Sequence, residues 1–362
     1  ERPFSMVIRG GASLGAYEAG VNWALLRLLK DLRDDPQATL EPELYAAAGA
    51  SAGAVNGFLA GLIWCTERPA GGAGPDTLDD NLFRNTWRYI DINELLKHAP
   101  LDQQLDEDQA GFSRAAMRQV EEDVRDAIGA RRFSPGCEVG FGVSLTRDKP
   151  VLFTNAGVDI SQQRLLLPMR LRGLATGALD IRHFEDLKRP NFENPSPDDL
   201  RERAFRSSVI YIDDGASDEI ERGPISLAAV FDAVKASSAF PVAFSPMNLS
   251  YCLFQNERQR AVSPGRGSYQ SEADPRGRCP DGYRRLSSRF VDGGVFDNDP
   301  VQLVRELSEL RMRGPGDTVR YIKVDPVKRR PARDTFQFET AQFAEAGDSL
   351  DLVLWAARPT LS

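Results

Sequence analysis

Short apolar runs and helically spaced apolar residues alternate along the first part of the chain. Residues 4–8 and 44–48 are almost continuously apolar, which is typical of buried strands. After each run, apolar residues recur every three or four positions, the spacing of an amphipathic helix. The chain therefore predicts two successive strand–helix units, whose helical positions are Leu14, Tyr17, Val21, Leu25, Leu28 and Leu32 in the first and Ala54, Val55, Phe58, Leu59, Leu62 and Ile63 in the second.

The same periodicities continue toward the C-terminus. Residues 137–145 alternate apolar and polar side chains, and residues 289–291 and 319–324 have the pattern of further short strands. Helices are expected at residues 117–128, from about residue 226 into the segment 236–241, and at residues 301–312.

This order of elements predicts the fold class. Because strands alternate with helices, we expect a single α/β domain in which a mixed, mostly parallel sheet carries helices on both faces. The domain is expected to span residues 1–330 and to be followed by a C-terminal extension at residues 331–362.

A Gly-x-Ser-x-Gly pentapeptide lies where the second strand meets its helix. It comprises residues 49–53, with Ser51 at its centre. A sharp strand-to-helix turn strains its central residue, needs small neighbours such as Gly49 and Gly53, and exposes the serine hydroxyl above the helix N-terminus. Since the pentapeptide also occurs by chance in Gly- and Ala-rich loops, the pattern alone predicts either a nucleophile or a structural turn.

A serine nucleophile needs a base, and the two histidines of the chain are poor candidates. Neither His98 nor His183 lies in a motif, so both are expected to be solvated or capping residues. Asp292 is the better candidate, because it follows a strand and precedes Gly293 and Gly294, which allow a tight turn and a close backbone approach. Taken alone, an ordinary turn aspartate is the simpler interpretation.

A glycine-rich turn follows the first strand. Gly10, Gly11 and Ala12 precede the first helix, so backbone N–H groups and the helix dipole favour an anion at this turn. A nucleotide phosphate is one candidate, but the spacing matches neither a P-loop nor a dinucleotide-binding fingerprint. With a serine nucleophile elsewhere in the chain, the same donors can stabilise the oxyanion of acyl transfer, which is the interpretation that we favour.

Taken in chain order, the glycine-rich turn, the pentapeptide and the late Asp-Gly-Gly resemble the motifs of the patatin-like phospholipase family. Residues 236–241, small side chains that end in Phe-Pro, resemble a further family segment, and the resemblance covers residues 4–326. It implies a three-layer α/β fold and a dyad of Ser51 and Asp292 that hydrolyses acyl esters of lipids, as a phospholipase A or a lysophospholipase does. It implies no metal or cofactor.

The resemblance also assigns the oxyanion hole to Gly10, Gly11 and Ala12, but the chain departs here from the family pattern. Members usually carry a third glycine at position 12 and a basic residue at position 14, where this chain has Ala12 and Leu14. The missing cation leaves a second hypothesis open, that of a non-catalytic lipid- or protein-binding protein with the same fold. Arg9 is the nearest cation that could compensate.

Composition limits the partners and the compartment. The net charge of −8 argues against broad attachment to nucleic acid or anionic lipid, so we expect a lipid or acyl-ester substrate and at most transient contact with a membrane surface. None of the four cysteines has metal-ligand spacing. Cys252 and Cys279 flank a polar segment and are expected to pair, whereas Cys65 and Cys137 lie in apolar surroundings. A periplasmic, secreted or membrane-peripheral protein is therefore expected.

Overall fold

The computed structural model describes residues 2–11, 14–68, 77–79, 81–96, 112–155, 158–184, 207–215, 218, 220–241, 243–254, 269–271, 278–312 and 318–325. The predictions on Ala12, on His98 and on the C-terminal extension at residues 331–362 lie outside these residues. The described helices are α1 (Gly15–Asp34), α2 (Ala52–Cys65), α3 (Leu82–Trp87), α4 (Ile92–Leu95), α5 (Ala115–Ala130), α7 (Leu227–Ser237) and α8 (Val301–Glu309), with a short 3-10 turn η2 (Gly293–Val295).

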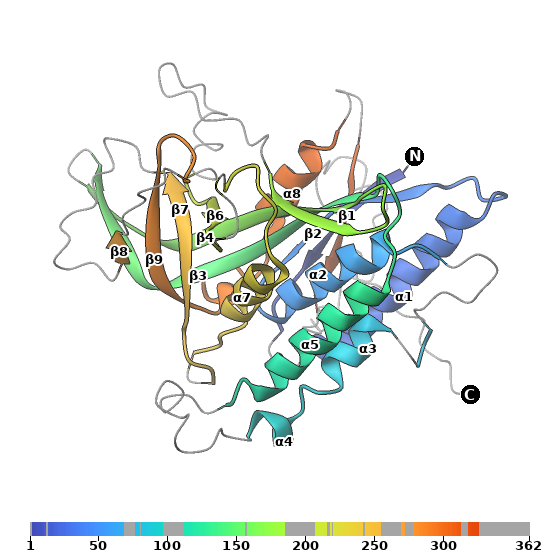
Figure 1. Ribbon diagram of the computed structural model, residues 1–362, viewed down its shortest axis with the longest axis horizontal. Coiled ribbons are helices and arrows are strands. Elements are labelled where there is room, and N and C mark those ends of the chain that lie inside the picture. Colours follow the sequence, from blue (N-terminus) through green and yellow to red (C-terminus); the bar gives the residue numbers. More distant parts are fainter. Residues whose placement is uncertain are drawn as a thin grey trace, which may run out of the picture.

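The strands form one mixed sheet (Figure 1). Along its main path the order is β10-β1-β2-β3-β9-β7-β6, while β4 pairs with β3 and β5, and β8 pairs with β9. The strands are β1 (Arg2–Ile8), β2 (Pro42–Gly49), β3 (Glu138–Asn155), β4 (Val158–Gly173), β5 (Leu179–His183), β6 (Ile210–Ile212), β7 (Met247–Phe254), β8 (Tyr269–Ser271), β9 (Tyr283–Val291) and β10 (Arg320–Val324).

The core of the sheet is parallel. Strand β1 pairs in parallel with β10 and β2, and β2 pairs in parallel with β3. The expected α/β fold with a mixed sheet is thus confirmed. The sequence did not reveal how far the sheet continues in antiparallel fashion, through the long β3–β4 hairpin on one side and through β9, β7 and β6 on the other.

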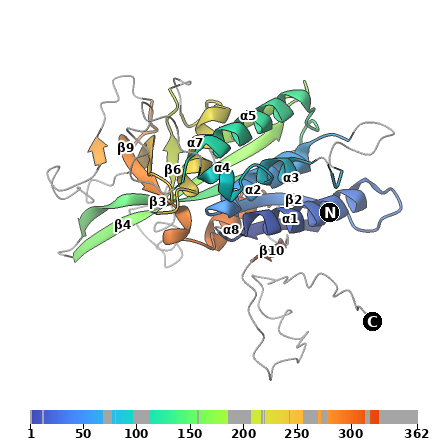
Figure 2. The same cartoon turned by 90° about the horizontal axis from the view of Figure 1, so that it is seen from below.

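Helices cover both faces of the parallel core, as expected, because successive side chains of a strand point to opposite faces. Met6 and Ile8 pack into a core that includes residues of α1, α2, α5 and α7, whereas Val7 packs with Leu303 and Leu307 of α8. Figure 2 shows α5 and α7 on one side of the strands and α8 on the other.

Two disulfides link parts of this fold. The expected bond between Cys252 and Cys279 is present, with a Cα–Cα distance of 5.7 Å. A second bond, which the sequence analysis did not predict, joins Cys65 at the end of α2 to Cys137 just before β3, with a Cα–Cα distance of 5.5 Å. Close by, the buried Lys30 ammonium donates to the carbonyl of Ile63 at 2.7 Å, in the last turn of α2. Two disulfides suggest a protein from an oxidising, extracytoplasmic compartment.

Among the described helices, none is long and apolar enough to cross a lipid bilayer.

A buried polar contact joins α1 to α2 and α3. The Glu18 carboxyl is fully buried, and its Oε2 accepts a hydrogen bond of 3.2 Å from the Asn56 amide. The same amide donates to Gly15 O at 3.1 Å, and Asn56 Oδ1 accepts from the Trp87 indole at 2.8 Å. Burial raises the pKa of Glu18 to about 8, although the Asn56 hydrogen bond opposes this rise. The fold therefore favours a neutral Glu18.

We expect the stability of the protein to fall as the pH rises toward 8. Glu18 ionises near pH 4.5 in the unfolded chain but near pH 8 in the folded protein, so its stabilising effect is complete below pH 4.5 and is lost as the pH rises through 8. Glu18→Gln should flatten this dependence and raise the free energy of unfolding above pH 8, by on the order of a few kcal/mol.

Urea unfolding of both proteins between pH 5 and pH 9 checks this expectation. The exposed Glu309, which pairs with Arg305 on its own helix, offers a control, because Glu309→Gln should leave the pH dependence unchanged. The same slope in the wild type and in Glu18→Gln would contradict a neutral buried Glu18.

Candidate active site

Ser51 sits on the sharp turn that the pentapeptide predicts. It has φ 53° and ψ −129°, and no other non-glycine residue in the described part of the chain has a positive φ. A side chain in this conformation is strained and persists only where its surroundings hold it. The turn is tight, because a Cβ at Gly49 would come within 2.2 Å of the Gly53 carbonyl and a Cβ at Gly53 within 2.2 Å of Ile8 O. Ser51 also forms the N-cap of α2.

The end of α7 holds the backbone of Ser51 from both sides. The Ser51 N–H donates to Ser237 Oγ at 3.0 Å, and the Ser237 hydroxyl donates in turn to Ser144 O on β3 at 2.7 Å. The hydroxyl of Ser238 donates to Ser51 O at 3.1 Å. Ser237 is fully buried, so the strained turn is fixed by partners that water does not replace.

Asp292 is positioned by the same segment. It follows β9, and its N–H donates to Ala239 O, just after α7, at 2.9 Å. Its Oδ1 accepts from the Gly294 N–H at 2.7 Å, which fixes the carboxyl plane. The tight turn depends on glycine, because a Cβ at Gly293 would lie 2.0 Å from Ser144 O. Ser144 therefore touches both the support of Ser51 and the turn that carries Asp292.

The hydroxyl of Ser51 and the carboxyl of Asp292 face each other. Asp292 is only 3% exposed, and burial raises its pKa, while hydrogen bonds from the Ser51 side chain and the Gly294 backbone lower it. Asp292 Oδ2 nevertheless has no partner with full hydrogen-bond geometry among the described residues. We therefore regard the contact with Ser51 as loose, as catalytic hydrogen bonds often are before substrate binds.

The glycine-rich turn lies against Ser51. A Cβ at Gly10 would come within 3.1 Å of the Ser51 Cβ. The Gly10 N–H donates to Asn298 O at 3.2 Å, and the Asn298 amide donates back to Gly10 O at 3.2 Å. The Gly10 amide is therefore occupied, whereas no carbonyl of the described residues accepts from Gly11. Ala12, the third expected member, lies outside the described residues.

Arg9 does not compensate for the basic residue that Leu14 replaces. Its guanidinium donates to Asp325 at 2.9 Å and lies 3.7 Å from the Asp299 carboxylate, so its charge is already neutralised. Leu14 itself is 41% exposed at the start of α1. The surface at the start of α1 is thus apolar at the position where the family pattern has a cation.

His183 is not the solvated or helix-capping residue that the sequence analysis expected. It is buried, its Nε2 lies 3.3 Å from Ile212 O, and its ring packs edge-on against Tyr211. Burial lowers the pKa of His183 to about 4, so the imidazole is neutral at physiological pH.

Sequence reasoning missed three residues that support this site. Ser237 belongs to the segment 236–241, which drew attention as a whole, but nothing in the pattern singles out its hydroxyl. Ser144 is one small polar position in an alternating strand. Asn298 follows the turn at Asp292, and no local signal indicates that it holds the glycine-rich turn.

Comparison with known proteins identifies the family. The family model described as patatin-like phospholipase matches residues 6–305, which include all of the site residues above. A search of the curated proteins finds none that matches. Because the family model spans most of the chain and the strained serine, the turn at Asp292 and the glycine-rich turn meet in one site, the chain belongs to the patatin-like phospholipase family.

Proposed function

We propose that this protein is a lipid acyl hydrolase of the phospholipase A or lysophospholipase type that uses Ser51 and Asp292 as a catalytic dyad. Family membership suggests lipid acyl hydrolase activity of the serine esterase kind, and hence lipid substrates. The observation that carries the finer proposal is the closeness of a strained serine to a buried carboxyl: burial raises the pKa of Asp292, the Ser51 side chain lowers it, and Asp292 Oδ2 has no hydrogen-bond partner among the described residues.

The arrangement supports a two-step reaction. Asp292 Oδ2 accepts the hydroxyl proton while Ser51 Oγ attacks the acyl carbonyl, and the resulting oxyanion takes hydrogen bonds from the amides of Gly11 and Ala12. Collapse breaks the ester bond, and Asp292 returns the proton to the leaving alcohol. Water, deprotonated by Asp292, then attacks the acyl-enzyme and releases the carboxylic acid with Ser51 restored. The positive end of the α2 dipole supports the negative charge that develops beside Ser51.

Neither histidine is needed in this scheme. The imidazole of His183 is held by Ile212 and Tyr211, and we propose no role for His98. The base is then a carboxylate, and its raised pKa brings it closer to the working pH, where a general base is most effective.

The non-catalytic alternative rests on Leu14. An apolar residue at this position offers no positive charge to a substrate phosphate. On this hypothesis the site binds lipid without hydrolysing it. A serine-directed fluorophosphonate separates the two hypotheses, because only an activated Ser51 should react with it.

We expect Ser51→Ala and Asp292→Asn each to abolish ester hydrolysis. Each should lower kcat by about a thousandfold or more, and the double variant should be no worse than either single variant, because members of one catalytic unit fail together. Steady-state assays on a panel of lysophospholipids and diacyl phospholipids measure this. His98→Gln and His183→Gln serve as controls and should stay within severalfold of wild type. A folded histidine variant as inactive as Ser51→Ala would replace the dyad with a triad.

The pH profile of kcat/KM should report the carboxylate base. Activity requires ionised Asp292, so it should fall as the pH falls through the pKa of this group, with a midpoint above 3.8 because burial raises that pKa. Measurement from pH 3 to pH 8 tests this expectation. A midpoint at or below 3.8 would speak against Asp292 as the titrating group.

Ser237→Ala should lower kcat more than it raises KM. The variant removes the acceptor of the Ser51 amide, which should cost about 1–3 kcal/mol of stability and let the strained turn relax. Displacement of the nucleophile should lower kcat by roughly a hundredfold. Ser308 is a matched control, since it is equally buried and bonds the Ser5 hydroxyl at 2.7 Å. If Ser308→Ala lowers kcat as much as Ser237→Ala, the support of Ser51 is not specific.

A further inference from the structure

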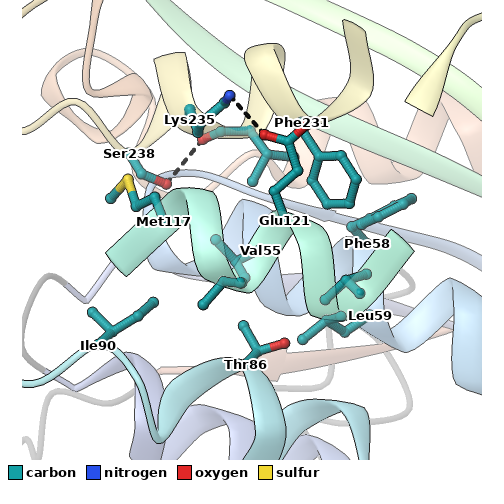
Figure 3. A pocket seen from close by; sticks show the side chains of 13 residues that line it. Val55, Phe58, Leu59, Thr86, Ile90, Met117, Glu121, Phe231, Lys235 and Ser238 are labelled. Atoms are coloured by element: carbon teal, nitrogen blue, oxygen red, sulfur yellow. Dashed lines mark hydrogen bonds and ion pairs between the residues drawn. The ribbon is translucent and has the colours of Figure 1, made fainter. Parts of the chain in front are cut away.

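A pocket that plays no part in the mechanism above lies beside the elbow (Figure 3). Its empty volume, open mouth included, is about 520 Å³. Helices α2, α5 and α7 form its walls, and Thr86 of α3 and Ile90 lie along one edge. The lining is predominantly aliphatic and aromatic, which is typical of sites for apolar ligands.

The pocket lies near Ser51, although Ser51 itself does not line it. Ser238, one of its lining residues, donates its hydroxyl to Ser51 O at 3.1 Å. Val55 also lines it, four residues after Ser51, and residues four apart lie on the same face of a helix. One turn further, Phe58 and Leu59 continue the lining, and Figure 3 shows them on the side away from Ser238. The pocket therefore runs along α2, away from Ser51.

The charged groups at the pocket bind each other. Lys235 on α7 lies 2.9 Å from the Glu121 carboxylate on α5 and 2.8 Å from the Asp232 carboxylate. The Arg125 guanidinium also lies 2.7 Å from the Glu121 carboxylate, so the two cations and two carboxylates balance and offer no net charge to a head group. The Lys235–Glu121 pair tethers α5 to α7 at the rim of the pocket. The polar part of a substrate is thus excluded from this side, and an apolar chain fits it.

Two aromatic rings close the far end. Phe58 and Phe231 are 2% and 7% exposed, and their rings meet edge to face with centroids 5.8 Å apart. Phe58 also packs on Phe141 of β3 at 5.4 Å, so it cannot easily swing aside. We infer that the packed Phe58–Phe231 pair bounds this end of the pocket.

We propose that this pocket binds the single unbranched acyl chain that is transferred to Ser51, and that the Phe58–Phe231 pair limits its length to the medium range. The proposal rests on the proposed function, because it describes the substrate of that same serine. From Ser51 to Phe58 the helix rises by about 10 Å, at 1.5 Å per residue. An extended octanoyl group has a similar length, whereas a palmitoyl group would have to bend or remain partly outside.

The test compares p-nitrophenyl acetate, octanoate and palmitate as substrates. The wild type should prefer octanoate in kcat/KM. Val55→Trp fills the pocket next to Ser51 and should lower activity on octanoate at least about tenfold more than on acetate. Phe231→Ala opens the end at the Phe58–Phe231 pair and should raise the palmitate-to-octanoate ratio by about tenfold or more. Phe231→Leu, a smaller change, should move the ratio in the same direction and replaces Phe231→Ala if that variant does not fold.

Val230→Ala is the matched control, because Val230 is the preceding residue of α7, is fully buried and does not line the pocket. Val230→Ala should lower the melting temperature about as much as Phe231→Ala does. It should leave the octanoate-to-acetate and palmitate-to-octanoate ratios of kcat/KM unchanged. Unchanged ratios in Val55→Trp and in both Phe231 variants, with turnover still dependent on Ser51, would overturn the pocket and leave the proposed function standing. If the wild type shows no Ser51-dependent hydrolysis of any ester, both the acyl-chain pocket and the proposed function are refuted. This result differs from unchanged chain-length ratios in an active enzyme.

Discussion

The site depends on one buried hydroxyl, that of Ser237. It accepts from the strained Ser51 amide and donates to Ser144 O, and so ties the end of α7 to the elbow and to β3. Two residues on, Ala239 O accepts the Asp292 amide. Ser51 and Asp292, the proposed nucleophile and base, lie more than two hundred residues apart in the chain, yet both are held by residues at the end of α7 and just after it. Neither can shift without moving the backbone that positions the other.

The local part of the site could be predicted from the sequence because each motif is a short turn. Glycine at positions 49, 53 and 293 is required by contacts below 2.5 Å to a hypothetical Cβ, and such constraints leave a mark in the pattern. The parallel core followed for the same reason, since β1 and β2 are continuous apolar runs with helices after them.

What could not be predicted is long-range. The link from Asn298 to Gly10 joins residues 288 positions apart, and the bond between Cys65 and Cys137 spans 72. Cys65 and Cys137 looked like ordinary core cysteines because only the packing of α2 against β3 brings them together. The antiparallel strands after β3 were hidden for a similar reason, because pairing partners are not encoded in the alternation of a single strand. The effect on catalysis of Leu14 in place of a basic residue stays a prediction.

The attachment of helix α2 at both of its ends affects how a lipid chain can enter the pocket. Its first turn is clamped by the elbow, and its last turn is fastened twice, by the Cys65–Cys137 bond and by the Lys30 ammonium on Ile63 O. Because both of its ends are fixed, we expect α2 to be rigid along its length. Helix α5, by contrast, is joined to α7 across the pocket by the ion pair of Glu121 and Lys235, which water can compete for. We therefore expect the wall formed by α5 to move more easily than the wall formed by α2, which would be the fixed edge for a bound acyl chain.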